Sequence, residues 1–183
     1  MTELIWQPSQ DRIDNANITT LITAINRTWG ADLADYADLH RFSIDEMEKF
    51  WASFWDFSGV ISKTKGERVL LNRDKMPGAE WFPDARLNYA ENLLRRRDDN
   101  DALVFWGEDR VKRRLSGNDL YNEVSRVKQA LEAAGVTSGD RVVGYLPNMP
   151  EAIIAMLAAV SLGAIWSSCS PDFGVKGVMD RFG

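Results

Sequence analysis

The pattern of hydrophobic positions in the second half of the chain predicts strands and helices in alternation. Apolar or alternating runs predict strands at residues 102–106, 111–115, 141–146 and 164–168. Apolar residues at the helical period predict helices at residues 116–134 and 151–162. The order strand, helix, strand from 141 to 168 is typical of a parallel pair with a right-handed crossover. The predicted fold class is therefore α/β, with the beginning of a parallel sheet in this half.

Turn and capping residues indicate where these predicted elements begin and end. Residues 107–109, Gly-Glu-Asp, are predicted to form the loop of a β-hairpin. Ser116 and Asp119 predict a capping box at the start of the next helix, and Gly135 predicts its C-terminal end. Pro150 suits the first position of the helix over 151–162.

The first hundred residues are predicted to be rich in helices and loops. One helix face is indicated by Ile18, Leu21, Ile22, Ile25 and Trp29. Asn15 or Asn17 is expected to cap that helix. Further along, residues 69–71 predict a short strand within a connecting loop, and residues 88–96 predict a short helix.

A second helix in this half is expected to begin at Ser43. Ser43 and Glu46 have the spacing of a capping box, and Phe42 with Met47 has the spacing of a hydrophobic staple. Its apolar stripe consists of Met47, Phe50, Trp51, Phe54 and Trp55. Such a stripe is either a ligand-stacking surface or core packing, and burial habits favour core packing.

The hydrophobic pattern changes at about Asp101, which is the predicted domain boundary. Residues 1–100 are expected to form a helix-rich N-terminal extension, and residues 101–183 the beginning of an α/β domain that is incomplete. The basic run at 95–97 suggests an anion site, but Asp98, Asp99 and Asp101 follow it directly and offset its charge. A solvated loop is therefore predicted there.

Composition narrows the classes of function. The chain has 183 residues, 45% of them hydrophobic, and a net charge of −5, which gives no general attraction to nucleic acid or anionic lipid. Cys169 and His40 are the only residues of their types, so no disulfide and no Cys/His metal cluster forms within one chain. These features and the absence of a secretory signal pattern in residues 1–10 predict a cytoplasmic protein.

One uncharged stretch, residues 152–171, has roughly the length that a bilayer requires. Its second half is crowded with serine, glycine and proline, so a buried helix followed by a buried strand explains it better than a membrane span. No membrane association is therefore expected.

Two loops follow the predicted parallel strands, at residues 147–150 and 170–174. Ligands bind beyond the carboxyl ends of parallel strands, so both loops are candidate walls of a cleft. They are also good plain turns, and Asp172 suits a helix cap. No phosphate-binding glycine motif is present. His40 and Cys169 are interpreted as structural, so no catalytic residue and no metal ligand is assigned.

Two segments carry a resemblance to a known family. The run GDRVVGYLPNMPEAIIAMLAAVSLGAIWSSCSPDFGVKGVMDRFG, residues 139–183, resembles the acetoacetyl-CoA synthetases, within the adenylate-forming acyl-CoA synthetase superfamily. The run WFPDARLNYAENLL, residues 81–94, resembles the signature of their N-terminal extension. Asp84 stands where the family pattern has glycine. Aspartate tolerates a positive φ less well than glycine, which matters if this position requires one.

The resemblance implies an ATP-dependent ligase that joins acetoacetate to coenzyme A through an acyl-adenylate, assisted by Mg²⁺. It implies that Ser170, Pro171 and Asp172 face coenzyme A, and that the phosphate-binding loop and a catalytic lysine lie beyond Gly183. On this interpretation the chain is an N-terminal fragment that is inactive alone and binds no cofactor tightly. Its parallel strands would leave an exposed apolar face, so self-association is expected.

Two alternatives remain open at this stage. One is a synthetase for another short acid, such as acetate or propionate, because no acyl-pocket residue can be assigned. The other is a non-catalytic helical interaction module, which the helix-rich first half and the missing motifs favour.

Overall fold

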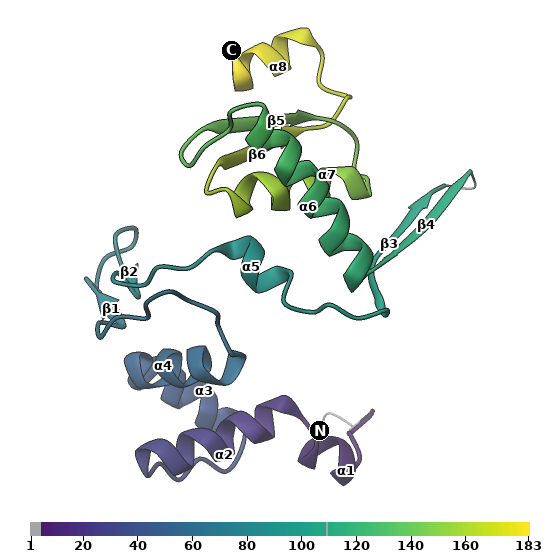
Figure 1. Cartoon of the computed structure of the whole chain (residues 1–183). Coiled ribbons are helices and arrows are strands. Elements are labelled where there is room, and N and C mark those ends of the chain that lie inside the picture. The colour runs from purple at the N-terminus through teal and green to yellow at the C-terminus, as the bar shows by residue number, and fades with distance from the viewer. Residues whose placement is uncertain (1–4, 109) are drawn as a thin grey trace. The chain divides into compact units, whose positions relative to one another are not determined.

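The computed structural model describes residues 5–108 and 110–183, and the chain divides into two compact units (Figure 1). Unit 1 spans Met1–Arg86 and unit 2 spans Leu87–Gly183. The predicted domain boundary at residues 100 and 101 stays a prediction, and the short helix before it belongs to unit 2.

From residue 5 on, unit 1 consists of four helices followed by a long loop that holds two short antiparallel strands. Its elements are α1 (Gln10–Asp14), α2 (Asn17–Trp29), α3 (Tyr36–Asp45), α4 (Met47–Ser58), β1 (Leu70–Leu71) and β2 (Glu80–Trp81). Leu21, Ile25 and Leu39 are buried together between α2 and α3. Ile22 packs against them, whereas Ile18 and Trp29 are 38% and 44% exposed, so the predicted face of the first helix is confirmed only in part. The predicted short strand is present as β1.

The predicted caps of α2 are wrong. Its N-cap is Ala16, with no side-chain capping bond, and Asn17 is already the first helical residue. Asn15 instead ends α1, where its side-chain amide donates to the Asp11 carbonyl at 2.7 Å. Helix α2 begins so soon after α1 that Asn15 caps the end of α1 and Asn17 already lies within α2.

The predicted start of the second helix at Ser43 is also wrong. Asp35 caps α3 eight residues earlier by accepting a bond from the Asp38 backbone N–H at 3.0 Å. Ser43 therefore lies within α3, where its hydroxyl donates to the His40 carbonyl at 2.7 Å. Glu46 has non-helical φ and ψ of −115° and 48°, and it separates α3 from α4 without a side-chain cap.

The aromatic stripe of α4 is not buried as predicted. None of the residues of α4 is buried, and Trp51 and Phe54 are 38% and 40% exposed. Their rings contact one another, and the Trp51 ring also contacts Trp81 of β2, so they form an open aromatic surface. The interpretation as core packing is therefore wrong for Trp51 and Phe54, whereas Phe50 of the same stripe packs against the buried cluster of unit 1.

The long loop of unit 1 is held by an ion pair at Asp84. The Arg68 guanidinium donates to both carboxylate oxygens of Asp84. This hydrogen bonding lowers the pKa of Asp84 and raises the pKa of Arg68. Asp84 is not among the described non-glycine residues with positive φ, which are Asn72, Phe82 and Glu108. Aspartate at this position is therefore compatible with the backbone and serves as an anchor for the loop.

Unit 2 confirms the order of elements predicted from the hydrophobic pattern. Its elements are α5 (Tyr89–Leu93), β3 (Asp101–Gly107), β4 (Val111–Ser116), α6 (Gly117–Ala133), β5 (Arg141–Tyr145), α7 (Pro150–Ser161), β6 (Ile165–Cys169) and α8 (Val175–Phe182). Strands β3 and β4 form an antiparallel hairpin that projects from its unit (Figure 1). Strands β5 and β6 are parallel. In the hairpin loop, Asp109 lies outside the described residues.

The core of unit 2 lies between its helices. Side chains from α5, β4, α6 and α7 meet there, and the buried members are Ala90, Leu94, Leu115, Leu120, Val124, Ile154, Leu157 and Ala158. Pro150 occupies the first turn of α7, and Gly135 follows α6 with a φ of +88°, both as predicted.

The uncharged stretch at residues 152–171 forms a helix followed by a strand, as predicted. Among residues 5–108 and 110–183, no helix has the length and apolar character needed to cross a membrane.

The predicted capping box of α6 is present. The Ser116 hydroxyl accepts from the Asp119 N–H at 3.1 Å, and Asp119 accepts from the Ser116 N–H at 3.0 Å. The Ser116 hydroxyl also donates to the Asp119 carboxylate, and these bonds lower the pKa of Asp119. Because the carboxylate is favoured in the folded state, its stabilising effect is present above its ordinary pKa near 4 and is lost as the pH falls through the lowered folded value.

Replacing Ser116 with alanine is expected to lower the stability of unit 2 by about 1 kcal/mol at pH 7, because two capping bonds are lost. The difference from the unchanged chain should begin to shrink below about pH 4 and should shrink further as the pH falls through the lowered pKa of Asp119 in the folded state. Urea unfolding with hydrogen exchange followed in the segments of unit 2, at pH 7 and over a series of values below pH 4, measures both effects. Ser125→Ala, within α6, is the matched control, and an equal loss in that variant would contradict the capping explanation.

The parallel strands are more exposed than predicted. Val143, Tyr145 and Ile165 share one face of the β5–β6 pair and are 52%, 55% and 56% exposed. Helix α7 packs on the strands, and Gly144 and Cys169 are buried. The prediction of buried strands holds only for the side under α7, and the exposed apolar face that the sequence predicts for these strands is present.

Candidate functional site

The candidate site lies at the carboxyl ends of β5 and β6, where the two predicted loops emerge. The parallel register pairs Tyr145 with Cys169, so both strands end at the same edge. The Leu146 N–H donates to the Cys169 carbonyl at 3.3 Å and extends the pairing by one residue. The loops at 147–150 and 170–174 are thus neighbours, as the strand, helix, strand order predicts.

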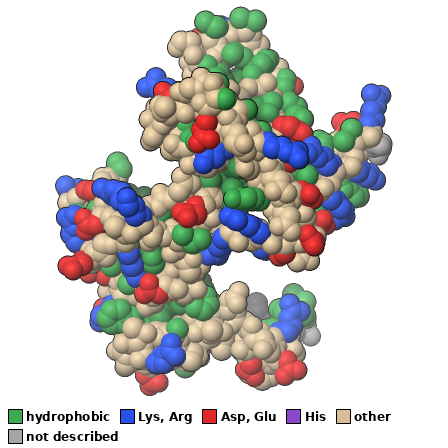
Figure 2. Space-filling view, in the orientation of Figure 1, with side chains coloured by type: hydrophobic (Ala, Val, Ile, Leu, Met, Phe, Trp, Pro, Cys, Tyr) green, Lys and Arg blue, Asp and Glu red, His purple; other side chains and the backbone are tan. Residues whose placement is uncertain are grey.

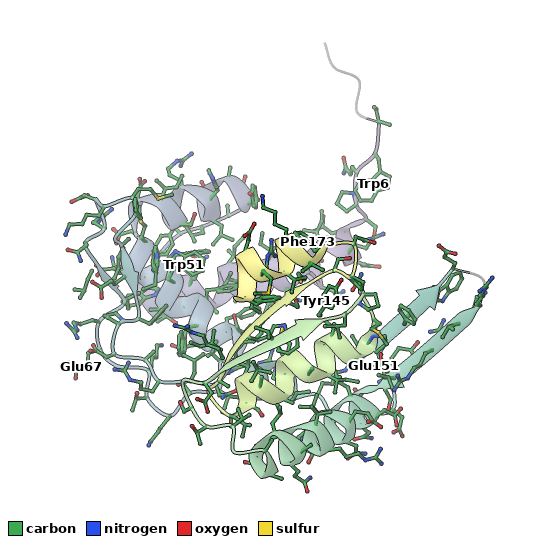
Figure 3. The ribbon with its side chains drawn as sticks, turned by 90° about the horizontal axis from the view of Figure 1, so that it is seen from above. Trp6, Trp51, Glu67, Tyr145, Glu151 and Phe173 are labelled. Carbon is green, nitrogen blue, oxygen red and sulfur yellow. The ribbon has the colours of Figure 1, made fainter. Side chains whose placement is uncertain are left out.

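Tyr145 anchors the second loop from the end of β5. Its hydroxyl lies 2.9 Å from the Pro171 carbonyl oxygen and 3.0 Å from the Phe173 carbonyl oxygen, so one hydrogen is shared between two acceptors. Tyr145 and Phe173 lie close together in Figure 3. The loop is therefore tied to the strand next to its own, which fixes its path across the strand ends.

Ser170 and Asp172 shape the same loop from within. The Ser170 hydroxyl donates to the Asp172 carboxylate at 2.8 Å, and the Ser170 carbonyl accepts from the Phe173 N–H at 3.1 Å. The prediction that Asp172 caps the following helix is wrong, because Gly174 is the N-cap of α8. The Asp172 carboxylate is drawn back to Ser170 instead. Ser170 is half-buried, while Pro171 and Asp172 are exposed.

Helix α8 continues from this loop, and none of its residues is buried. The Arg181 guanidinium lies 4.8 Å from the centre of the Phe173 ring, an arrangement that favours a cation–π contact. Val175 and Met179 are exposed, and Figure 2 shows hydrophobic side chains gathered over α8 at the top of the view. The loop is thus held from Tyr145 on one side and from α8 on the other.

The first loop, residues 147–150, leads into α7. A hollow of about 300 Å³ opens beside it. Asn148, Met149, Pro150 and Ile153 line it together with residues 103–106 of β3. Glu151, in the first turn of α7, forms an ion pair with Arg113 of β4, and its other carboxylate oxygen is buried without a hydrogen bond. This pair ties the hairpin to the start of α7.

Among the described residues, no group of three or more His, Cys, Asp or Glu side chains is placed to hold a metal ion. His40 lies on α3, where its ring stacks on Tyr36, and Cys169 is buried at the end of β6. The sequence reasoning missed Tyr145, although a tyrosine at the last position of a strand beside a ligand loop is a usable signal.

Two family models match the chain. The model described as acetyl-coenzyme A synthetase N-terminus matches residues 36–93, and the model described as AMP-binding enzyme matches residues 90–181. The second match contains α6, the β5–β6 pair and both loops of the candidate site. The predicted resemblance is therefore found in both segments that suggested it.

The chain is also similar to individual proteins over nearly its whole length. It is 47% identical to the acetoacetyl-coenzyme A synthetase of Rhizobium meliloti and 42% identical to the acetoacetyl-CoA synthetase of Macaca fascicularis, each over 98% of this chain. The solved acetoacetyl-CoA synthetase from Streptomyces lividans matches 99% of the chain with a TM-score of 0.87 and 42% identity.

These matches cover only part of the relatives. The chain spans 27% of the length of the two curated relatives and 28% of the solved chain. The predicted fold class is confirmed, because the matched part is the N-terminal part of an adenylate-forming enzyme. Since the AMP-binding enzyme model matches half of the chain, the chain belongs to the AMP-binding enzyme family.

Proposed function

We propose that this chain is the N-terminal part of an ATP-dependent ligase that converts acetoacetate and coenzyme A to acetoacetyl-CoA. The observation that carries the proposal is the similarity to acetoacetyl-CoA synthetases along nearly the whole chain. The proposed protein acts in the cytoplasm on small molecules. In this proposal residues 1–100 form the extension and residues 101–183 begin the adenylation domain.

The proposed reaction has two steps. The acetoacetate carboxylate attacks the α-phosphorus of ATP, and pyrophosphate leaves to give an acyl-adenylate. The coenzyme A thiol then attacks the acyl carbonyl, AMP leaves, and the thioester forms. Mg²⁺ would supply charge neutralisation on the phosphates in the first step. No residue of this chain is proposed to contact the reacting atoms.

The contribution proposed for this chain is a wall of the coenzyme A site. Ser170, Pro171 and Asp172 form the loop at the carboxyl end of β6, where ligands of parallel sheets bind. The bond between Ser170 and Asp172 and the anchor from Tyr145 hold the loop in one conformation. A preorganised loop binds a ligand with less loss of entropy than a mobile one.

The full-length protein that contains this chain tests the proposed function. We expect acetoacetyl-CoA and AMP to form from acetoacetate, ATP and coenzyme A, with a higher kcat/KM than for acetate or propionate. A preference for acetate or propionate would favour the other short-acid synthetase, and no thioester from any of the three acids would favour a non-catalytic module. The isolated 183-residue chain is expected to show only background pyrophosphate exchange.

Replacing Tyr145 with phenylalanine tests the proposed loop. Loss of its hydroxyl bond, about 0.5–1.5 kcal/mol, is expected to raise the KM for coenzyme A about two- to tenfold in the full-length enzyme. Acetoacetate-dependent pyrophosphate exchange, which needs no coenzyme A, should be unchanged. Tyr89→Phe, at an exposed tyrosine of α5, is the control. An equal change in both half-reactions would contradict a role confined to the coenzyme A wall.

Self-association of the isolated chain is a further part of the proposal. The uncovered face of β5 and β6, with Val143 and Ile165 more than half exposed, is an apolar surface with unpaired strand edges. Sedimentation velocity over a concentration series is expected to show oligomers. A monodisperse monomer at every concentration would contradict this expectation.

A further inference from the structure

Unit 1 carries an open cluster of aromatic side chains, which we call the aromatic face. Its members are Trp51, Phe54 and Trp55 of α4, Trp81 of β2, and Phe82. Together with Ser58 and Val60 they line a hollow of about 490 Å³. Trp51, Phe54 and Trp81 are 38%, 40% and 43% exposed. Large apolar side chains gathered at this exposure on one hollow are typical of an interaction surface.

The shape of the aromatic face is fixed by contacts within unit 1. The Trp51 and Trp81 ring centres are 5.3 Å apart, and those of Trp55 and Phe82 are 4.5 Å apart. Phe82 has a φ of +45°, a conformation that costs energy for a bulky residue and persists only where its surroundings impose it. Its N–H donates to the Val69 carbonyl at 2.8 Å. The strained backbone therefore holds the Phe82 ring in the wall of the hollow.

The loop behind Phe82 is tied down as well. Arg68 pairs with Asp84, and the Ala85 N–H donates to the Phe82 carbonyl at 2.9 Å. The charged residues near the face are thus occupied with one another, since Lys65 also pairs with Asp56 of α4. The hydroxyl of Ser58, the polar side chain in the lining, donates to the Phe54 carbonyl. The aromatic face therefore suits an uncharged, apolar occupant.

The length of the relatives indicates what this occupant is. The solved synthetase has the same fold over 99% of this chain, and the match uses 28% of its own chain, so most of it has no counterpart here. We propose that the aromatic face is the docking surface for an apolar segment of the synthetase that lies outside these 183 residues. This inference rests on the proposed function, because it requires the longer protein.

Thiol labelling of Ser58→Cys tests the proposal, because residue 58 lines the hollow. A maleimide is reacted with this variant in the 183-residue chain and in the full-length synthetase. We expect labelling of the full-length protein to be slower by about tenfold or more, because the thiol reacts only after local opening. Glu67→Cys, at an exposed residue of the same unit (Figure 3), is the control and should label equally in both proteins.

A second variant, Trp81→Ala in the full-length Ser58→Cys protein, is expected to restore fast labelling by weakening the docking contact. Equal labelling of Ser58→Cys in both proteins overturns the proposal. Slow labelling of Ser58→Cys in the 183-residue chain also overturns the proposal. If that slow labelling depends on protein concentration, the occupant of the face is a second copy of the chain. Thioester formation by the same full-length protein is measured in parallel, so a failure of the docking proposal is distinguishable from a failure of the proposed function.

Discussion

Replacing Leu157 with alanine is expected to destabilise unit 2 by about 2–5 kcal/mol. Leu157 is 2% exposed on α7, in the cluster that joins this helix to α5, α6 and β4. Alanine removes three carbon atoms and leaves a cavity, because neighbours such as Ile154 and Val124 are fixed by their own packing. Few other single substitutions in this chain are expected to lower stability by as much.

Hydrogen exchange followed by mass spectrometry measures this loss in unit 2 separately from unit 1, which a single unfolding curve for a two-unit chain does not. Val143→Ala, on the exposed face of β5, is the control and should change stability by no more than about 0.5 kcal/mol. A loss of less than about 1 kcal/mol for Leu157→Ala would contradict a tightly packed core between these helices.

The sequence predicts unit 2 well because its local signals agree with one another. The Ser116 and Asp119 capping box, Gly135 after α6 and Pro150 at the start of α7 each mark an end that the hydrophobic period also indicates. Strand order then follows from the short connections. The parallel pairing of β5 with β6 can be predicted from the order strand, helix, strand alone.

Unit 1 is predicted less well because its local signals compete. Ser43 and Glu46 have the spacing of a capping box, but Asp35 begins the helix earlier and leaves Ser43 in its interior. The stripe of α4 has the pattern of a core helix, yet Trp51 is exposed. Periodicity tells which side of a helix is apolar, and it does not tell whether the chain supplies a partner for that side.

The candidate site is likewise predicted only in part from the sequence. The loops at 147–150 and 170–174 follow from the strand, helix, strand order, which sequence reasoning can supply. Which side chains hold the loop is a matter of tertiary contact. Tyr145 reaches carbonyls 26 and 28 residues further along, and Asp172 bonds with Ser170 instead of capping α8. Neither contact has a spacing rule from which it could be predicted.

Replacing Gly144 with alanine is expected to destabilise unit 2 by about 1–3 kcal/mol and to weaken coenzyme A binding in the full-length enzyme. A Cβ atom at this position would lie 2.6 Å from Cη2 of Trp166 and 2.5 Å from Cδ2 of Leu146. The half-buried Trp166 ring lies against Gly144, so either this ring or the strand end must shift. Tyr145 follows directly, and the loop that it anchors should shift with it.

Gly174→Ala is the matched control for this prediction, because a Cβ atom there meets nothing within 4 Å. With hydrogen exchange followed in the segments of unit 2, the urea midpoint of Gly174→Ala should stay close to that of the unchanged chain, whereas the midpoint of Gly144→Ala should fall clearly. If both variants unfold at the same urea concentration, the Trp166 ring moves aside without cost and the close approach is not required. If Gly144→Ala loses stability but keeps the KM for coenzyme A, the strand end and the loop are not coupled through Tyr145.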